Sequence, residues 1–189
     1  MILRDVIICL GDSLTFGSRD IIEGQGYPAI LASLIEGETG KICICLNKGR
    51  AKDTSTDVLL RAYDDLLAYP EAQLVLLLVG TNDLKGTPQP EIFRNNIKQI
   101  VNIARVCNKK ILVGTLPPIY SLGMWCFPHN VMDGVNQYNK VLAELSIEMD
   151  FPIVDFSDMK KYLIDGVHFR HRGYGEMARR WLTAIKEKL

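Results

Sequence analysis

The stretch that decides the fold covers residues 6–15 and reads Val6-Ile7-Ile8-Cys9-Leu10-Gly11-Asp12-Ser13-Leu14-Thr15. Its first five residues are apolar and rich in β-branched side chains, which is typical of a strand buried on both faces in a parallel sheet. The apolar run stops at a glycine that is followed by two polar residues. Ligands of open α/β sheets bind outside the carboxyl ends of the strands, so we expect a site where this strand ends.

Four more apolar runs follow, and segments with helical spacing alternate with them. The expected strands are Val6–Leu10, Ile42–Leu46, Leu74–Val79, Ile111–Leu116 and Ile153–Phe156. The expected helices cover about Tyr27–Ile35, Thr56–Ala68, Glu91–Val106, Val135–Met149 and Tyr174–Lys188. This alternation predicts an α/β fold with helices on both faces of a parallel sheet.

Length and charge narrow the class of protein. The 189 residues fit a single domain over residues 1–189, large enough to bury a core without metals or disulfides. The 22 basic and 22 acidic residues give a net charge of zero, which favours neither nucleic acid nor an anionic membrane as a partner. The longest apolar run, Leu74–Val79, is too short to span a membrane, and the N-terminus lacks a signal-peptide layout, so we expect a cytoplasmic protein.

The cysteines predict reduced thiols and no metal site. There are five of them, an odd number without a paired framework. Cys43 and Cys45 lie two residues apart and therefore share one face of a strand, where core packing is the expected role. A C-x-C pair offers too few ligands for a metal ion, and we expect no cofactor.

Polar blocks that follow the expected strands supply the groups needed for acyl transfer. A serine hydroxyl needs an adjacent base, and His168 can take that role for Ser13. Asp165, three residues earlier, can fix the tautomer and orientation of the imidazole. The tetrahedral oxyanion needs preorganised donors, which the Asn82 amide and the Ser13 N–H can provide.

Three of these blocks carry a resemblance. Gly11-Asp12-Ser13-Leu14, Gly80-Thr81-Asn82-Asp83 and Asp165-Gly166-Val167-His168 occur in this order over nearly the whole chain, which resembles the GDSL (SGNH) hydrolase family. The resemblance implies a flavodoxin-like three-layer sandwich with strand order 2-1-3-4-5. It also implies hydrolysis of esters or thioesters without metal, with Ser13, Asp165 and His168 as catalytic residues and Asn82 as an oxyanion donor.

One block departs from the family pattern. The family usually has Asn-x-Gly-x-Ser-Gly-Asp-Thr, whose second glycine donates a backbone N–H to the oxyanion. Residues 47–54 read Asn-Lys-Gly-Arg-Ala-Lys-Asp-Thr, so Lys52 stands at that glycine. Its N–H can still donate if the backbone tolerates a residue with a Cβ. Its ammonium can instead add positive charge near the oxyanion or bind an anionic group of the substrate.

Other interpretations stay open at this point. A catalytically impaired binding module of the same fold would explain Lys52, and an acyltransferase would use the same acyl-enzyme with an alcohol as acceptor. The substrate is expected to be a small acyl ester or an acylated sugar. A long apolar loop after the fourth strand carries Tyr120, Trp125 and Phe127. Its composition suits the wall or lid of a pocket, and equally a loop that packs onto the core or into a contact with a second subunit. The oligomeric state is not specified by the sequence.

Overall fold

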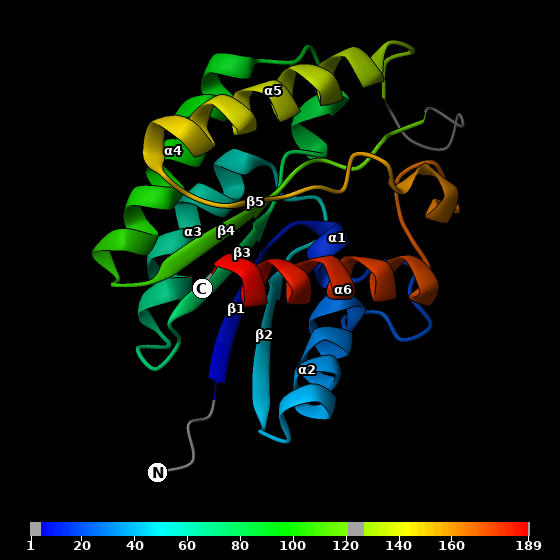
Figure 1. The fold of residues 1–189 in the computed structure, drawn as a ribbon. Helices are drawn as coiled ribbons and strands as arrows, with labels where there is room; N and C mark the ends of the chain where they lie inside the picture. Colours follow the sequence, from blue (N-terminus) through cyan, green and yellow to red (C-terminus); the bar gives the residue numbers. More distant parts are fainter. Residues whose placement is uncertain (1–4, 121–126, 189) are drawn as a thin grey trace.

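The structure is a computed structural model that describes residues 5–120 and 127–188. Its centre is a sheet of parallel strands in the order β2-β1-β3-β4-β5 (Figure 1). The strands are β1 Asp5–Gly11, β2 Cys43–Gly49, β3 Leu74–Leu78, β4 Lys110–Gly114 and β5 Ile153–Val154. The predicted α/β class and strand order are confirmed.

The helices lie close to the expected segments. They are α1 Ser13–Phe16, α2 Gly26–Thr39, α3 Ser55–Leu67, α4 Pro90–Val106, α5 Val131–Met149 and α6 His171–Lys188, with 3-10 turns η1 Asn82–Lys85 and η2 Met159–Tyr162. The short α1 was not expected as a separate element. Among the described residues, no helix combines the length and the apolar character that crossing a membrane requires.

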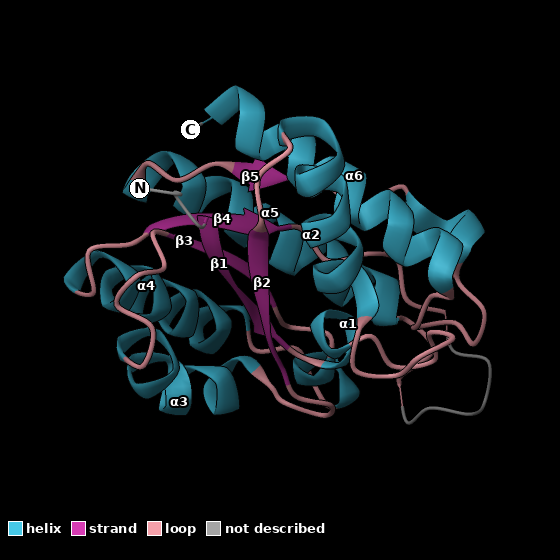
Figure 2. Cartoon of the chain, turned by 90° about the horizontal axis from the view of Figure 1, so that it is seen from below, coloured by secondary structure: helices cyan, strands magenta, loops and turns pink. Residues whose placement is uncertain are grey.

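Two helical layers cover the sheet. Ile8 and Leu10 of β1 belong to the core beneath α3, α4 and α5, whereas Ile7 and Cys9 belong to the core beneath α2 and α6. Successive side chains of a strand point to opposite faces, so one apolar strand supplies both cores. Figure 2 shows α3 and α4 on one side of the sheet and α2 and α6 on the other.

The second strand is longer than the sequence predicted. Its expected end was Leu46, but the strand continues to Gly49 because Asn47 and Gly49 pair in register with Cys9 and Gly11 of β1. Polar residues would normally end a strand prediction. Here the pairing with β1 keeps the polar residues in the strand as far as the carboxyl edge of the sheet, where they lie beside the first block.

The fifth strand is shorter than predicted and ends at Val154 instead of Phe156. The Val154 carbonyl accepts a hydrogen bond from Thr115 N at 2.9 Å, and Phe156 N then donates to the Thr115 hydroxyl at 2.7 Å. The side-chain hydroxyl replaces a backbone partner and turns the chain out of the sheet. The Phe156 ring packs edge-on against Trp181 of α6, with centroids 5.2 Å apart.

Gly49 allows the second and first blocks to touch. A Cβ built on Gly49 would lie 2.1 Å from the backbone nitrogen of Phe16 and 2.6 Å from the carbonyl carbon of Thr15. Real Cβ atoms do not approach backbone this closely, so only glycine permits this contact between the end of β2 and α1.

Asp12 caps α1 from within the core. Its Oδ1 accepts a hydrogen bond from Leu14 N at 2.9 Å, and the residue is fully buried. Burial raises the pKa of the Asp12 carboxyl to about 7, and the neighbouring Asp83 carboxylate adds to the rise. The proton on Asp12 is therefore bound more tightly in the folded chain than in the unfolded one.

We expect Gly49→Ala to lower the free energy of unfolding by about 2 kcal/mol or more, because the added methyl group must displace the backbone of α1. Urea unfolding followed by circular dichroism measures this change. The matched control is Gly37→Ala in α2, whose Cβ would meet nothing within 4 Å. It should raise stability by up to about 1 kcal/mol through helix propensity. Equal effects of the two substitutions would contradict the close contact.

We expect Asp12 to make the fold less stable as the pH rises. Between the unfolded pKa of 3.8 and the folded value of about 7, the folded state retains a proton that the unfolded state has lost. The free energy of unfolding therefore falls across this window, by an amount on the order of a few kcal/mol. Asp12→Asn keeps an acceptor for Leu14 N and removes the titration, so its stability should depend less on pH.

Urea unfolding at several pH values between about 4 and 8 measures the slope of stability against pH. Asp64→Asn removes an exposed carboxylate from α3 and should keep the wild-type slope. The same slope for wild type and Asp12→Asn would show that Asp12 is ionised in the folded chain throughout this range.

Candidate active site

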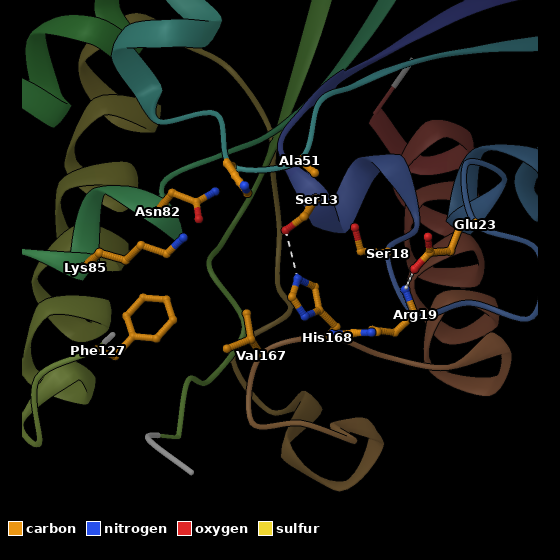
Figure 3. Close-up of a pocket in the computed structure, with 11 residues that line it drawn as sticks. Ser13, Ser18, Arg19, Glu23, Ala51, Asn82, Lys85, Phe127, Val167 and His168 are labelled. Atoms are coloured by element: carbon orange, nitrogen blue, oxygen red, sulfur yellow. Dashed lines mark hydrogen bonds between the residues drawn. The ribbon is translucent and has the colours of Figure 1, made fainter. Parts of the chain in front are cut away.

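A chain of hydrogen bonds joins three residues from opposite ends of the sequence. Ser13 Oγ lies 3.0 Å from His168 Nε2, and His168 Nδ1 lies 2.9 Å from Asp165 Oδ2 (Figure 3). All three residues are buried, with exposed fractions of 6% for Ser13 and His168 and 8% for Asp165. The structure thus brings together the three residues that the sequence predicted as catalytic.

A tight turn holds Asp165 beneath the imidazole. Asp165 Oδ1 accepts hydrogen bonds from the N–H groups of Val167 at 3.0 Å and His168 at 2.7 Å, while Ile164 N donates to His168 O at 3.0 Å. Gly166 provides the positive φ of 86° that the turn needs. The carboxylate and the ring therefore belong to one locally closed unit.

The carboxylate of Asp165 stays ionised in this turn. Burial alone would raise its pKa, but the hydrogen bonds from His168 and Val167 outweigh burial and hold the pKa below its usual range. Arg19 Nε also lies 3.6 Å from Asp165 Oδ2. An ionised Asp165 favours the tautomer that carries a proton on His168 Nδ1 and leaves Nε2 free to accept from Ser13.

Two candidate N–H donors, the backbone of Ser13 and the amide of Asn82, come from separate elements beside the cavity. Ser13 is the first residue of α1, so its N–H has no carbonyl within the helix to bond. Asn82 begins η1 and donates one hydrogen of Nδ2 to the Asp53 carbonyl at 2.9 Å, which fixes the orientation of the amide. A second hydrogen remains on that nitrogen, and Asn82 lines the same cavity as Ser13 and His168.

The backbone at Lys52 takes the conformation that favours glycine. Its φ is 76°, in the left-handed region, and a turn bond from Asp53 N to Arg50 O at 3.3 Å closes the loop around it. The chain therefore keeps at Lys52 the kind of backbone geometry that a glycine would adopt, at a steric cost of about 1–2 kcal/mol for a residue with a Cβ.

Arg61 of α3 connects the first and second blocks, and it was not among the residues predicted for the site. Its guanidinium donates to Asp53 Oδ2 at 2.8 Å, to Asp65 Oδ2 at 2.5 Å and to the Gly11 carbonyl at 2.9 Å. Arg61 is only 9% exposed. A signal was present in the sequence, because Arg61 and Asp65 interrupt the apolar face of a helical segment at a spacing of four residues.

Asp83 anchors the third block to α3. Its carboxylate accepts from Ser55 N at 2.8 Å and from the Ser55 hydroxyl, and Asn96 Nδ2 donates to the same hydroxyl at 2.9 Å. These bonds connect η1, α3 and α4 immediately behind Asn82. The side chain of Asp83 is thus occupied in supporting the block and does not line the cavity.

A cavity of about 270 Å³ opens in front of the hydrogen-bonded chain. Its lining residues are Ser13, Ser18, Arg19, Glu23, Ala51, Lys52, Asn82, Lys85, Phe127, Val167 and His168. Phe127 forms part of the wall, which is one of the two roles left open for the long loop. Tyr120 does not line this cavity, because its ring lies under Lys160 Nζ at 4.4 Å from the centroid. Trp125 lies outside the described residues.

The cavity holds a serine hydroxyl and an imidazole side by side. Within the portion of the chain that the structure describes, no group of three or more His, Cys, Asp or Glu residues is arranged to hold a metal ion. The cavity instead combines a serine hydroxyl, an imidazole and several N–H donors in front of a space large enough for a small organic molecule.

Solved structures share the fold over almost the whole chain. A lipase/acylhydrolase from Enterococcus faecalis has a TM-score of 0.82 at 22% identity, with 98% of this chain and 97% of that chain covered. Axe2, an acetylxylan esterase from Geobacillus stearothermophilus, has a TM-score of 0.79 at 21% identity, covering 98% and 96%. A putative lipolytic protein of the G-D-S-L family from Desulfitobacterium hafniense DCB-2 has a TM-score of 0.76 at 20% identity, covering 94% and 98%.

At these identities the likeness establishes the fold. No curated protein matches the sequence closely enough to count as a relative. The family model for the GDSL-like lipase/acylhydrolase family matches residues 9–175, a range that contains all the blocks described above. The chain belongs to the GDSL-like lipase/acylhydrolase family.

Proposed function

We propose that this protein is a serine hydrolase that cleaves small carboxylic esters or thioesters through an acyl-enzyme. The observation that carries the proposal is the unbroken chain from Ser13 Oγ to His168 and on to Asp165, at the wall of a cavity in a member of an acylhydrolase family. This arrangement has the nucleophile, base and orienting group in hydrogen-bond reach of one another.

In the acylation step, Ser13 Oγ attacks the acyl carbon while His168 Nε2 takes its proton. Asp165 accepts the hydrogen bond from Nδ1 and stabilises the imidazolium that forms. The carbonyl oxygen becomes an oxyanion that the N–H groups of Ser13 and Lys52 and the Asn82 amide hold. His168 then gives its proton to the leaving alcohol or thiol, and the acyl group stays on Ser13.

Deacylation repeats these steps with water. His168 Nε2 takes a proton from the water, whose oxygen attacks the acyl carbon and forms a second oxyanion in the same place. Collapse of this intermediate returns the proton to Ser13 and releases the carboxylic acid. An alcohol in place of water would give a new ester, so an acyltransferase would use the same residues, and added alcohols would reveal it as a second product.

The backbone at Lys52 supports the enzyme interpretation over the binding-module interpretation. The latter rested on Lys52 at the position of the donor glycine, but the backbone there has the positive φ of 76° that a glycine would take. The N–H of Lys52 makes no hydrogen bond to a backbone carbonyl in the described part of the chain. A lysine at this position is therefore compatible with oxyanion binding by the backbone.

We expect Ser13→Ala to abolish hydrolysis of 4-nitrophenyl esters, with a loss of kcat on the order of 10⁴–10⁶. Wild-type turnover should depend on acyl chain length, because the cavity is small. Release of 4-nitrophenol measures both effects. A fluorophosphonate probe should attach covalently to wild type, one probe molecule per chain by mass spectrometry, and should not attach to Ser13→Ala.

Ser33→Ala is the matched control, since it removes an exposed hydroxyl from α2 and should keep wild-type turnover and labelling. Substantial hydrolysis by Ser13→Ala would assign the nucleophile to another residue. Absence of both turnover and labelling in wild type would overturn the proposed function.

We expect Asn82→Ala to lower kcat by about 10²–10³ with little change in KM, because the lost donor acts on the oxyanion. Steady-state kinetics measure the split between kcat and KM. A purely structural role of Asn82, through its bond to the Asp53 carbonyl, would lower the stability in urea and leave kcat intact. That outcome would remove Asn82 from the set of oxyanion donors.

A further inference from the structure

The charged side chains around the cavity are mostly cationic. Arg19, Lys52 and Lys85 line it together with one acidic residue, Glu23. The whole chain has a net charge of zero, so this local excess is a property of the site and not of the composition.

The charges on the α1 side of the cavity have partners. Arg19 Nε lies 3.6 Å from Asp165 Oδ2, and Glu23 Oε1 accepts from the backbone N–H of Arg19 at 3.1 Å. Figure 3 shows Arg19 and Glu23 next to each other, on the far side of His168 from Asn82. This pair contributes little net charge to the cavity.

The two lysines that line the cavity have no such partners among the described residues. Neither Lys52 nor Lys85 forms an ion pair with a described residue. The carboxylates that lie close to them in sequence are already occupied. Asp53 pairs with Arg61 at 2.8 Å, and Asp83 accepts from Ser55 N at 2.8 Å. Within the described part of the chain, two cations that line the cavity thus have no internal counterion.

Lys52 occupies a position where a side chain is costly. Its φ of 76° lies in the region that glycine adopts freely and other residues rarely do. Backbone strain of this kind persists where the surrounding structure enforces it, and it is concentrated at functional sites. The observation that this strained residue lines the cavity points to a use for its side chain.

Lys85 is the second of these lysines that line the cavity. It is the last residue of η1, the turn that Asn82 begins. In Figure 3 its side chain extends from η1, and its ammonium ends next to the side chain of Asn82. Phe127 and Val167 supply an apolar surface on the neighbouring wall.

We propose that this site selects esters that carry an anionic group, and that the ammonium groups of Lys52 and Lys85 bind that group. The inference rests on the proposed function and narrows its substrate class. A carboxylate would be the typical anion, next to a short apolar part that contacts Phe127 and Val167. The charge can come from the acyl half, as in a dicarboxylic acid monoester, or from the alcohol half, as in the ester of a hydroxy acid.

Two pairs of substrates test the proposal on the full chain. Monomethyl glutarate and methyl pentanoate differ by a charge on the acyl half, and proton release at constant pH follows their hydrolysis. The anion of 4-acetoxybenzoic acid and 4-acetoxybenzamide differ by a charge on the alcohol half, and absorbance follows their hydrolysis. In at least one pair, kcat/KM for the anion should exceed that for the neutral ester by about tenfold at low ionic strength.

Salt and substitutions identify the source of this preference. The ratio of the two kcat/KM values should fall toward one in about 0.5 M NaCl, because both lysines are exposed and their charges are screened. Lys85→Met and Lys52→Gly should each lower the ratio about three-fold, and the double variant should abolish the preference. Because the ratio compares two substrates on one enzyme, a general loss of activity in a variant cancels.

Lys110→Met is the matched control. It removes an exposed lysine at the start of β4, the opposite edge of the sheet from the site, and should keep the wild-type ratio. Preference in the glutarate pair places the anion on the acyl half, and preference in the benzoate pair places it on the alcohol half.

Two results would overturn the inference while leaving the proposed function intact. The first is a wild-type kcat/KM for the neutral ester that equals or exceeds the value for the anionic ester in both pairs. The second is a double variant that keeps the wild-type ratio of the two kcat/KM values. If wild type hydrolyses none of the four esters and the fluorophosphonate does not label Ser13, the proposed function itself is wrong, and this inference falls with it.

Discussion

The geometry of the site depends on one buried cation. Arg61 donates to Asp53, Asp65 and the Gly11 carbonyl, and these acceptors come from the loop after β2, from α3 and from the end of β1. Removing one partner from a buried ionic cluster leaves an uncompensated charge or carbonyl, which typically costs several kcal/mol. The three segments are therefore held at fixed distances from one another, and the blocks that face the cavity are built on them.

The effect of this cluster reaches the proposed oxyanion donors through the backbone. Asp53 binds Arg61 with its carboxylate, and its carbonyl accepts from the Asn82 amide at 2.9 Å. Lys52 is the residue immediately before Asp53, and Ser13 follows two residues after Gly11. A single guanidinium thus fixes the segments that carry all three N–H donors. Preorganised donors stabilise developing charge best because they need not rotate or desolvate when the charge appears.

Much of the fold could be predicted because it depends on local patterns. Continuous apolar runs such as Leu74–Leu78 indicate strands buried on both faces, and the rule that ligands bind at the carboxyl edge brought Ser13, Asn82 and His168 together before any coordinates were known. The sequence was less informative where tertiary contacts override local preference. β2 extends to Gly49 because its polar end pairs with β1, and β5 ends at Val154 because the Thr115 hydroxyl takes over the next bond.

The residues that surround the catalytic side chains were harder to predict than the catalytic side chains themselves. Arg61 and Asp65 interrupt the apolar face of α3, but only the contact of Arg61 with the Gly11 carbonyl shows that it supports the first block. Arg19 approaches Asp165 from a loop whose path depends on the positive φ of 69° at Arg19 itself. Lys85 lines the cavity from the last position of η1, a 3-10 turn that no apolar periodicity predicts. Such contacts join segments distant in sequence through irregular backbone, and periodicity carries no information about them.

At Lys52, the backbone N–H and the charge of the side chain can serve different purposes. The backbone there contributes an N–H whose direction is fixed by the loop from Arg50 to Asp53, and this loop is held by Arg61. The side chain is exposed and forms no ion pair with a described residue, and the backbone keeps a φ that glycine would adopt. In the proposed mechanism, a lysine here therefore adds charge near the reacting carbonyl while the backbone N–H stays available as a donor. Specificity can then change at this position at the cost of local backbone strain alone. For that reason, a lysine where a glycine would be expected is better explained as a change in the substrate that the site accepts than as a loss of its chemistry.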